Sequence, residues 1–166
     1  MANELLLLPL HPVGAGAVAL LLADPRPLEA LVLDEHLNGQ HGTNRAPGPG
    51  QLAANTDLDA IAAWLDRVRG SPRTFANYRK EAERLLLWAL IAQAKPLSSL
   101  THEDLMAYRS FMTDPAPADR WVSAGAQKCS RLDPAWRPFS GPLSPSSVQL
   151  ALTILSGLFS RVGRES

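Results

Sequence analysis

The segment SPRTFANYRKEAERLLLWALIAQA, residues 71–94, has two faces of opposite chemistry when its residues are placed on a helix. At about 100° per residue, one narrow stripe carries three cations and one amide, namely Arg73, Asn77, Lys80 and Arg84. The opposite side is apolar, as in a helix packed against a core, and carries Phe75, Tyr78, Ala82, Leu85, Leu86 and Ala89. The polar stripe suits the major groove of duplex DNA and its flanking phosphates, although a solvated surface helix would show the same pattern.

Three further segments also show helical spacing of their apolar residues. Together with the first segment, they predict helices over residues 57–69, 72–94, 101–114 and 145–162. Each expected start carries capping residues, namely Thr56 or Asp57, Ser71 followed by Pro72, Thr101 with Asp104 three residues later, and Ser144. No segment after residue 52 alternates as a strand does, so the sequence predicts an all-α bundle.

Two stretches are expected to lie outside these helices. Residues 1–52 form an N-terminal extension ending in a Gly- and Pro-rich linker, residues 39–51, and residues 53–166 form the helical domain. Within that domain, residues 115–143 make a long proline-rich connection, and connections of this length are often functional or mobile. We expect Trp121 and Trp136 to anchor it to the domain. Its cations can approach a nucleic-acid backbone and are Arg120, Lys128, Arg131 and Arg137.

Charge is unevenly distributed along the 166 residues, although the formal net charge is zero. Residues 1–50 hold five acidic and two basic residues, a net of −3, so the remainder of the chain carries +3. Between Arg67 and Arg84, six basic residues stand against Glu81 and Glu83, a local net of +4. The charge distribution therefore indicates a moderately basic region that would attract nucleic acid, in a protein that is not strongly basic as a whole.

Signals for membrane insertion, metal binding and catalysis are weak. Cys129 is the only cysteine, which excludes a disulfide framework and favours a reducing compartment. The apolar stretch 4–23 carries Glu4 and is broken by Pro9 and Pro12, so we expect it to pack on the domain or a neighbour rather than to span a membrane. The histidines lack metal-ligand spacing, and there is no Gly-rich phosphate loop or nucleophile motif. We therefore expect no metal, no cofactor and no catalytic residue.

The order of elements resembles the amino-terminal core-binding, or SAM-like, domain of tyrosine recombinases, the phage-integrase family. The resemblance covers residues 57–162 and is carried by RTFANYRKEAERLLLWA, PLSSLTHEDLMAYRSFM and GPLSPSSVQLALTILSGLF. The family has a Thr and a Tyr four residues apart, an aromatic residue about ten further on, and a Leu-Thr-acidic helix start. These are matched here by Thr74, Tyr78, Trp88, Leu100, Thr101 and Asp104. Residues 1–50 lie outside the resemblance, and the connection 115–143 looks longer than in compact members.

The resemblance implies an orthogonal four-helix bundle that forms half of a clamp around a recombination site, for DNA integration or recombination. Its expected partners are double-stranded DNA, the catalytic domain of a longer parent chain and further recombinase subunits on DNA, in the cytoplasm at the nucleoid. The family's catalytic Arg, Lys, His-x-x-Arg and Tyr set has no counterpart here, because no His is followed three residues later by Arg. Tyr78 and Tyr108 fall at core-facing positions, where we expect buried rings with hydrogen-bonded hydroxyls. We therefore expect a DNA-binding fragment that is not itself an enzyme.

By the same resemblance, the second and fourth long helices would lie near the major groove. Arg73 and Lys80 would neutralise phosphates, while Asn77 and Arg84 suit hydrogen bonds to adenine and guanine edges. Small polar residues at the start of the last helix would contact phosphates or bases, namely Ser146, Gln149 and Thr153.

Two other classes of protein fit the same pattern. A helical protein-interaction adaptor without DNA binding would use the apolar residues 1–33 and the last helix as docking surfaces. An unrelated helix-turn-helix regulator would use the tight turn at Gly70 and Ser71, but the helix that follows is longer than most recognition helices.

Overall fold

The computed structural model of the chain describes residues 28, 31, 33, 36–41, 56–125 and 129–162, with backbone alone at residues 161 and 162. The elements are α2 (Asp57–Asp66), α3 (Pro72–Ile91), the 3₁₀-helix η3 (Leu97–Ser99), α4 (His102–Thr113), α5 (Ala118–Trp121) and α6 (Pro145–Val162). Within the described ranges there are five α-helices and no strand beyond an isolated bridge, which confirms the all-α prediction. None of the helices in these ranges combines the length and the apolar character that crossing a membrane requires.

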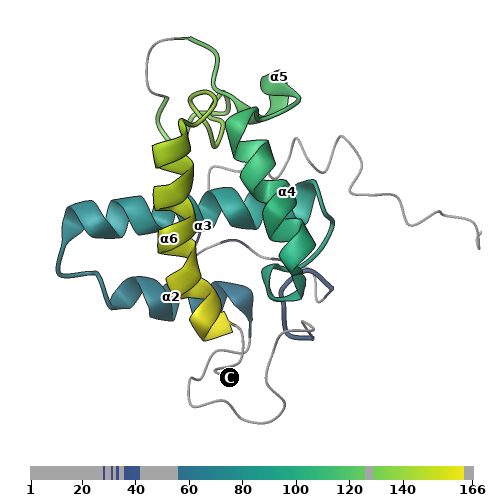
Figure 1. The fold of residues 1–166 in the computed structure, drawn as a ribbon. Coiled ribbons are helices and arrows are strands. Elements are labelled where there is room, and N and C mark those ends of the chain that lie inside the picture. Colours follow the sequence, from purple (N-terminus) through teal and green to yellow (C-terminus); the bar gives the residue numbers. More distant parts are fainter. Residues whose placement is uncertain are drawn as a thin grey trace, which may run out of the picture.

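The other three longer helices, α2, α4 and α6, pack around α3. In Figure 1, α2 and α3 run side by side in opposite directions, α6 crosses over both, and α4 flanks the carboxy-terminal half of α3. Direct contacts join α6 to α2, α3 and α4, and join α2 to α3. The amino-terminal half of α3 extends past α6 toward the α2–α3 turn, which leaves that half of the helix open on more sides (Figure 1).

Local capping explains where the helices begin. Thr56 caps α2 through a capping box with Asp59, and Thr101 caps α4 through the predicted box with Asp104. The Ser144 hydroxyl accepts a hydrogen bond from the Ser147 N–H at 3.2 Å, as expected for the start of α6. Ser71 differs from the prediction because it occupies the N-cap of α3 without a side-chain cap bond, and its hydroxyl bonds Thr74 instead.

The carboxy-terminal ends of α2 and α3 come about three residues earlier than predicted. Beyond α2, the Val68 and Arg69 N–H groups bond carbonyls three residues back, so the chain continues as turns. Beyond α3, the Lys95 N–H bonds the Ala89 carbonyl and the chain reverses through Ala94 at φ 51. A single left-handed residue just after the last turn is a common helix stop.

The carboxy-terminal half of α3 is the centre of the core. Every residue from Glu81 to Ile91 is buried, including those that helical periodicity places on the polar side. A helix covered on all sides shows no exposed polar stripe, whatever its sequence period. The two-faced description of residues 71–94 therefore holds only for the amino-terminal half of α3.

Part of the predicted extension completes this core. Leu28 and Leu31 belong to the same buried cluster as α2, α3 and α6. The Asp57 N–H donates to the Asn38 carbonyl at 2.7 Å, and the Ser98 N–H donates to the Asp57 carboxylate at 3.1 Å. These contacts join the described residues of the range 28–41 to the helical core, while the apolar stretch 4–23, whose packing was predicted, and residues 42–51 of the predicted linker lie outside the described residues.

Gly39→Ala is expected to be strongly destabilising. Gly39 has φ 83, and an added Cβ would overlap the carboxyl group of Asp57. A left-handed non-glycine residue costs about 1–3 kcal/mol, and a displaced Asp57 leaves the buried Ser98 N–H without its acceptor at about 1–3 kcal/mol more. Urea denaturation measures the change in the free energy of unfolding.

The matched control is Gly70→Ala, because nothing lies within 4 Å of a Cβ at that exposed position. This control should change the free energy of unfolding by less than about 0.5 kcal/mol. Equal stability of the two variants would show that residues 36–41 do not pack on α2 as described.

The proline-rich connection is folded over its described residues. It contains α5, and Val122 and Phe139 form a parallel bridge in which the Phe139 N–H donates to the Trp121 carbonyl. Trp121 and Phe139 are almost fully buried, which confirms the predicted anchoring role of Trp121. The connection therefore forms a cover over one end of the helices, and sequence patterns predicted neither α5 nor the bridge.

Candidate nucleic-acid interface

Three of the four residues in the predicted polar stripe are exposed. Arg73, Asn77 and Lys80 lie on the open amino-terminal half of α3. The Lys80 side chain is 50% exposed, and its ammonium lies 3.8 Å from the nearer Glu81 oxygen, at the outer limit of an ion pair. These side chains can reach an anion in solvent.

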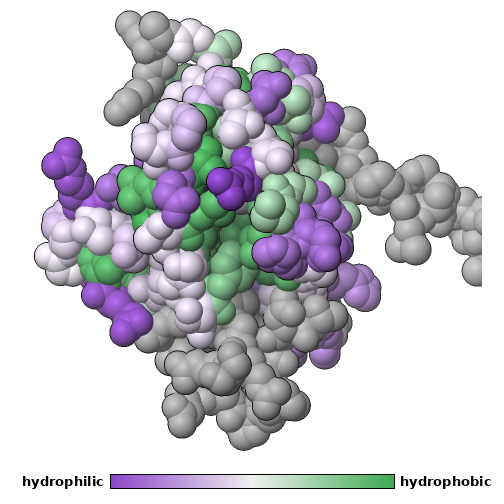
Figure 2. Space-filling model, in the orientation of Figure 1, coloured by the Kyte–Doolittle hydropathy of each residue, from purple (hydrophilic) through white to green (hydrophobic). Residues whose placement is uncertain are grey.

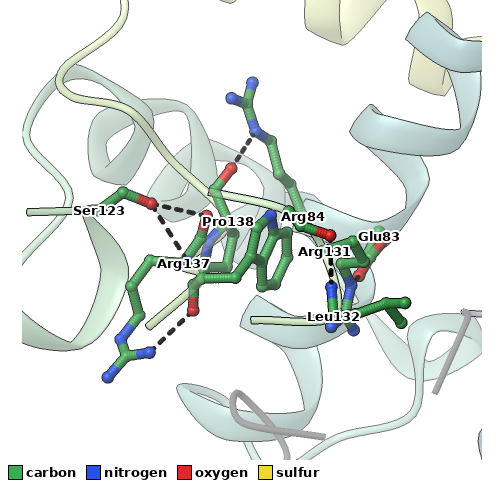
Figure 3. A network of polar contacts seen from close by, with 9 residues as sticks. Glu83, Arg84, Ser123, Arg131, Leu132, Arg137 and Pro138 are labelled. Carbon is green, nitrogen blue, oxygen red and sulfur yellow. Dashed lines mark hydrogen bonds and ion pairs between the residues drawn. The ribbon is translucent and has the colours of Figure 1, made fainter. Parts of the chain in front are cut away.

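The exposed position expected for Arg84 is wrong. Arg84 is only 8% exposed, because the connection covers it. Its guanidinium donates to the Pro138 carbonyl at 2.8 Å and to Glu81 at 3.3 Å, and it lies 4.6 Å from the centre of the Phe139 ring. Figure 3 shows Arg84 pointing at the Pro138 carbonyl. In this arrangement Arg84 joins α3 to the connection and cannot contact a base.

A second set of contacts joins the same two elements. Arg131 forms an ion pair with the buried carboxylate of Glu83, visible in Figure 3, and its guanidinium lies 4.1 Å from the centre of the Trp136 ring. Trp136 is partly buried and packs against the core. The predicted anchoring role of Trp136 is thus confirmed, and Arg131 is engaged within the protein.

Other cations of the connection have varied positions. Arg137 donates to the carbonyls of Asp119, Pro134 and Trp136, so its guanidinium braces the connection itself. Arg120 is partly buried, and Lys128 lies outside the described residues. Among the cations that were predicted to approach a nucleic-acid backbone, Arg131 and Arg137 are therefore engaged in contacts within the protein.

The Glu81 carboxyl of α3 and the Tyr108 hydroxyl of α4 are polar groups that are buried at the covered half of α3. Burial raises the pKa of the Glu81 carboxyl, and the charges of Arg84 and Lys80 only partly offset this. Burial, and secondarily the charge of Glu81, raises the pKa of Tyr108. The Tyr108 ring is buried as predicted, but among the described residues its hydroxyl has no hydrogen-bond partner, so the expectation of a bonded hydroxyl is wrong.

A cavity of about 540 Å³ separates the exposed side of α3 from the connection. It combines apolar and aromatic walls with several cations. The lining residues are Phe75, Ala76, Arg79, Lys80, Glu83, Arg84, Arg131, Trp136 and Pro138. Two members of the predicted stripe, Lys80 and Arg84, therefore border a pocket rather than a flat surface.

The predicted contact residues of α6 form a separate surface. Ser146, Gln149 and Thr153 are exposed, on the side of α6 opposite the buried Val148 and Ala151. The Thr153 hydroxyl donates to the Gln149 carbonyl at 2.9 Å, and the Ser146 hydroxyl lies 3.2 Å from that of Ser144. No hydrogen bond or ion pair between described residues links this surface to Arg73, Asn77 or Lys80.

Few of the covering contacts could have been found from the sequence. The spacing of Glu81 and Arg84 by three residues signals an ion pair on one helix. No local pattern relates Glu83 to Arg131, which is 48 residues away.

No group of three or more His, Cys, Asp or Glu side chains suited to a metal ion occurs within the described ranges.

The fold and this surface define a mostly helical protein with exposed basic residues on one half of its central helix. Comparison with models of protein families gives no match, and comparisons with curated proteins and with solved structures give none either.

Proposed function

We propose that this chain is a duplex-DNA-binding module of the core-binding type found in tyrosine recombinases, with its four longer helices forming an orthogonal bundle. The observation that carries the proposal is the exposure of Arg73, Asn77 and Lys80 on the part of α3 that the other helices leave open. The crossing of α6 over α2 and α3 in Figure 1 supports the bundle type. Residue patterns in α3, α4 and α6 supply the resemblance to the family.

In this function the chain binds DNA and performs no chemistry by itself. Arg73 and Lys80 contact phosphates. Asn77 lies between them in the sequence and hydrogen-bonds a base edge, for which its amide group suits adenine. Arg84 supports the interface indirectly by holding the connection against α3. Ser146, Gln149 and Thr153 form a second surface on α6, and the partners are the catalytic half of a parent recombinase and further subunits on DNA.

Lys80→Ala and Arg73→Ala are each expected to weaken duplex binding and to flatten its salt dependence. Every phosphate contact releases counterions, so each loss should reduce the slope of log K against log salt by about 0.9. The measurement is a fluorescence-anisotropy titration of a labelled duplex at several salt concentrations. Arg109→Ala removes an exposed cation from α4 and is the matched control, since it makes the same charge change away from α3.

An unchanged slope in both α3 variants, or an equal change in the Arg109 variant, would contradict binding through α3. Binding that follows net charge alone would alter all three variants equally. A complete lack of salt-dependent binding by the unmodified protein would favour the second candidate function.

That second candidate is a helical protein-interaction adaptor. Large apolar side chains favour it, because Leu150 on α6 and Met106 on α4 are 60% and 49% exposed. Figure 2 shows apolar surface between the positions that α6 and α4 occupy in Figure 1. An adaptor would use this surface for a partner and would show no salt-dependent affinity for DNA.

A further inference from the structure

The cavity beside α3 has the size of a small-molecule site. Its volume of about 540 Å³ lies within the usual range for pockets that enclose a compact ligand, about 300–1,000 Å³. It lies between Phe75 and Ala76 of α3 and Trp136 and Pro138 of the connection. Aromatic and aliphatic walls of this kind favour a planar apolar ring.

Contacts among the lining residues themselves hold the walls of the cavity in place. The ion pair of Arg131 with Glu83 positions the guanidinium against the Trp136 ring. The hydrogen bond from Arg84 fixes the backbone at Pro138. Because both walls are positioned before a ligand arrives, binding requires little ordering of side chains.

The residues that line the cavity carry a net positive charge, which favours anionic ligands over neutral or cationic ones. Four cations and one carboxylate line the cavity, a net of +3, and including the adjacent Glu81 that pairs with Arg84 reduces this to +2. Lys80 is half exposed and its contact with Glu81 is long, so its ammonium can turn toward a ligand. A ligand with an acidic group near the rim would satisfy this charge.

We propose that this cavity binds a small planar aromatic molecule that carries an anionic group, such as a phosphate or carboxylate. The ring lies between Ala76 and Trp136, and the anionic group lies against Lys80. A free nucleotide and the terminal nucleotide of a strand share this chemistry. The inference goes beyond duplex binding and does not depend on it.

The test is a titration of the isotope-labelled full chain with adenosine 5′-monophosphate, followed by NMR. The indole N–H resonance of Trp136, assigned with Trp136→Phe, should shift with saturation. Adenosine without the phosphate and inorganic phosphate without the ring should each bind at least about tenfold more weakly. A 5′-phosphorylated single strand distinguishes a strand terminus from a free nucleotide, since a strand-specific site would prefer it to the monophosphate.

Ala76→Phe and Arg73→Ala separate the pocket from the proposed duplex interface, because each changes only one of them. Ala76→Phe fills the cavity without changing charge and should reduce affinity for the monophosphate more than tenfold; Ala76→Leu replaces it if the larger residue impairs folding. Lys80→Ala should reduce affinity about fivefold for the monophosphate and leave adenosine unchanged. Arg73 does not line the cavity, so Arg73→Ala should weaken duplex binding alone.

The proposed ligand site would be overturned by the absence of a saturable shift at Trp136, or by monophosphate binding that is unchanged in the Ala76→Phe variant. Equal affinity for adenosine and its monophosphate would overturn the anionic part of the proposal. Neither result bears on duplex binding, which the Arg73 variant tests separately.

Discussion

Arg84→Ala is expected to lower the free energy of unfolding by about 3–5 kcal/mol, the range for removing one partner of a buried ion pair. Arg84 and Glu81 are both almost fully covered, with side-chain exposures of 10% and 8%. Removing the guanidinium leaves the Glu81 carboxylate without its nearest cation and the Pro138 carbonyl without its donor. Urea denaturation followed by circular dichroism measures the loss.

The loss should depend on pH in a defined direction. Burial already raises the pKa of Glu81, and Arg84 is the first of the two charges that lower it, so removing Arg84 raises this pKa further. A carboxyl group whose pKa is higher in the folded protein favours folding below its unfolded pKa, and that contribution is lost as the pH rises through the folded pKa. The Arg84→Ala deficit should therefore be larger near pH 8 than near pH 5.

The double variant Glu81→Gln/Arg84→Met is the control for charge. It removes both ions while retaining much of the side-chain volume, and such replacements are often neutral or stabilising. Its stability should exceed that of Arg84→Ala and show less dependence on pH. An equal deficit at both pH values would show that lost packing, rather than the uncompensated carboxylate, causes the destabilisation.

Phe139→Ala is expected to cost about 3–5 kcal/mol, the usual range for truncating a fully buried aromatic residue. The Phe139 ring is 1% exposed, lies 5.6 Å from the Phe111 ring of α4 in an edge-to-face arrangement, and receives the Arg84 guanidinium on its face. One substitution therefore removes a contact to α4 and a contact to α3. Thermal or urea unfolding measures the effect.

Leu132→Ala provides the matched control in the same connection. Leu132 is 63% exposed, so its truncation should change the stability by less than about 0.5 kcal/mol. Hydrogen exchange at the Phe139 amide, which bonds the Trp121 carbonyl, gives a second measurement. Small and similar effects of the two substitutions would mean that the connection is only loosely attached.

These contacts limit the proposed interface to one part of α3. The connection covers Arg84 and stands beside Lys80, whereas Arg73 and Asn77 lie nearer the open end of the helix. A duplex would therefore meet the first two to three turns of α3 and the rim of the cavity. In the proposed function the connection shapes the basic surface, so loss of Arg84 is expected to alter the proposed DNA affinity through that shape.

The four longer helices could be predicted from the sequence, because the signals for them are local. Capping boxes at Thr56 and Thr101, Pro72 at a first helical position and the apolar spacing of α6 each act within a few residues. The same local information predicted the exposure of Arg73, Asn77 and Lys80, which lie where α3 has few neighbours.

Which polar residues of α3 remain exposed depends on long-range packing that the sequence pattern does not show. Arg84 lies one turn after Lys80 on the same side of α3. It is buried nevertheless, because residues 131–139 fold back over that end of the helix. Glu83 meets Arg131 across 48 residues, and Leu28 reaches the core from the far side of the predicted linker. Helical periodicity describes one helix in isolation, whereas burial depends on segments that are distant in sequence and packed by long-range contacts.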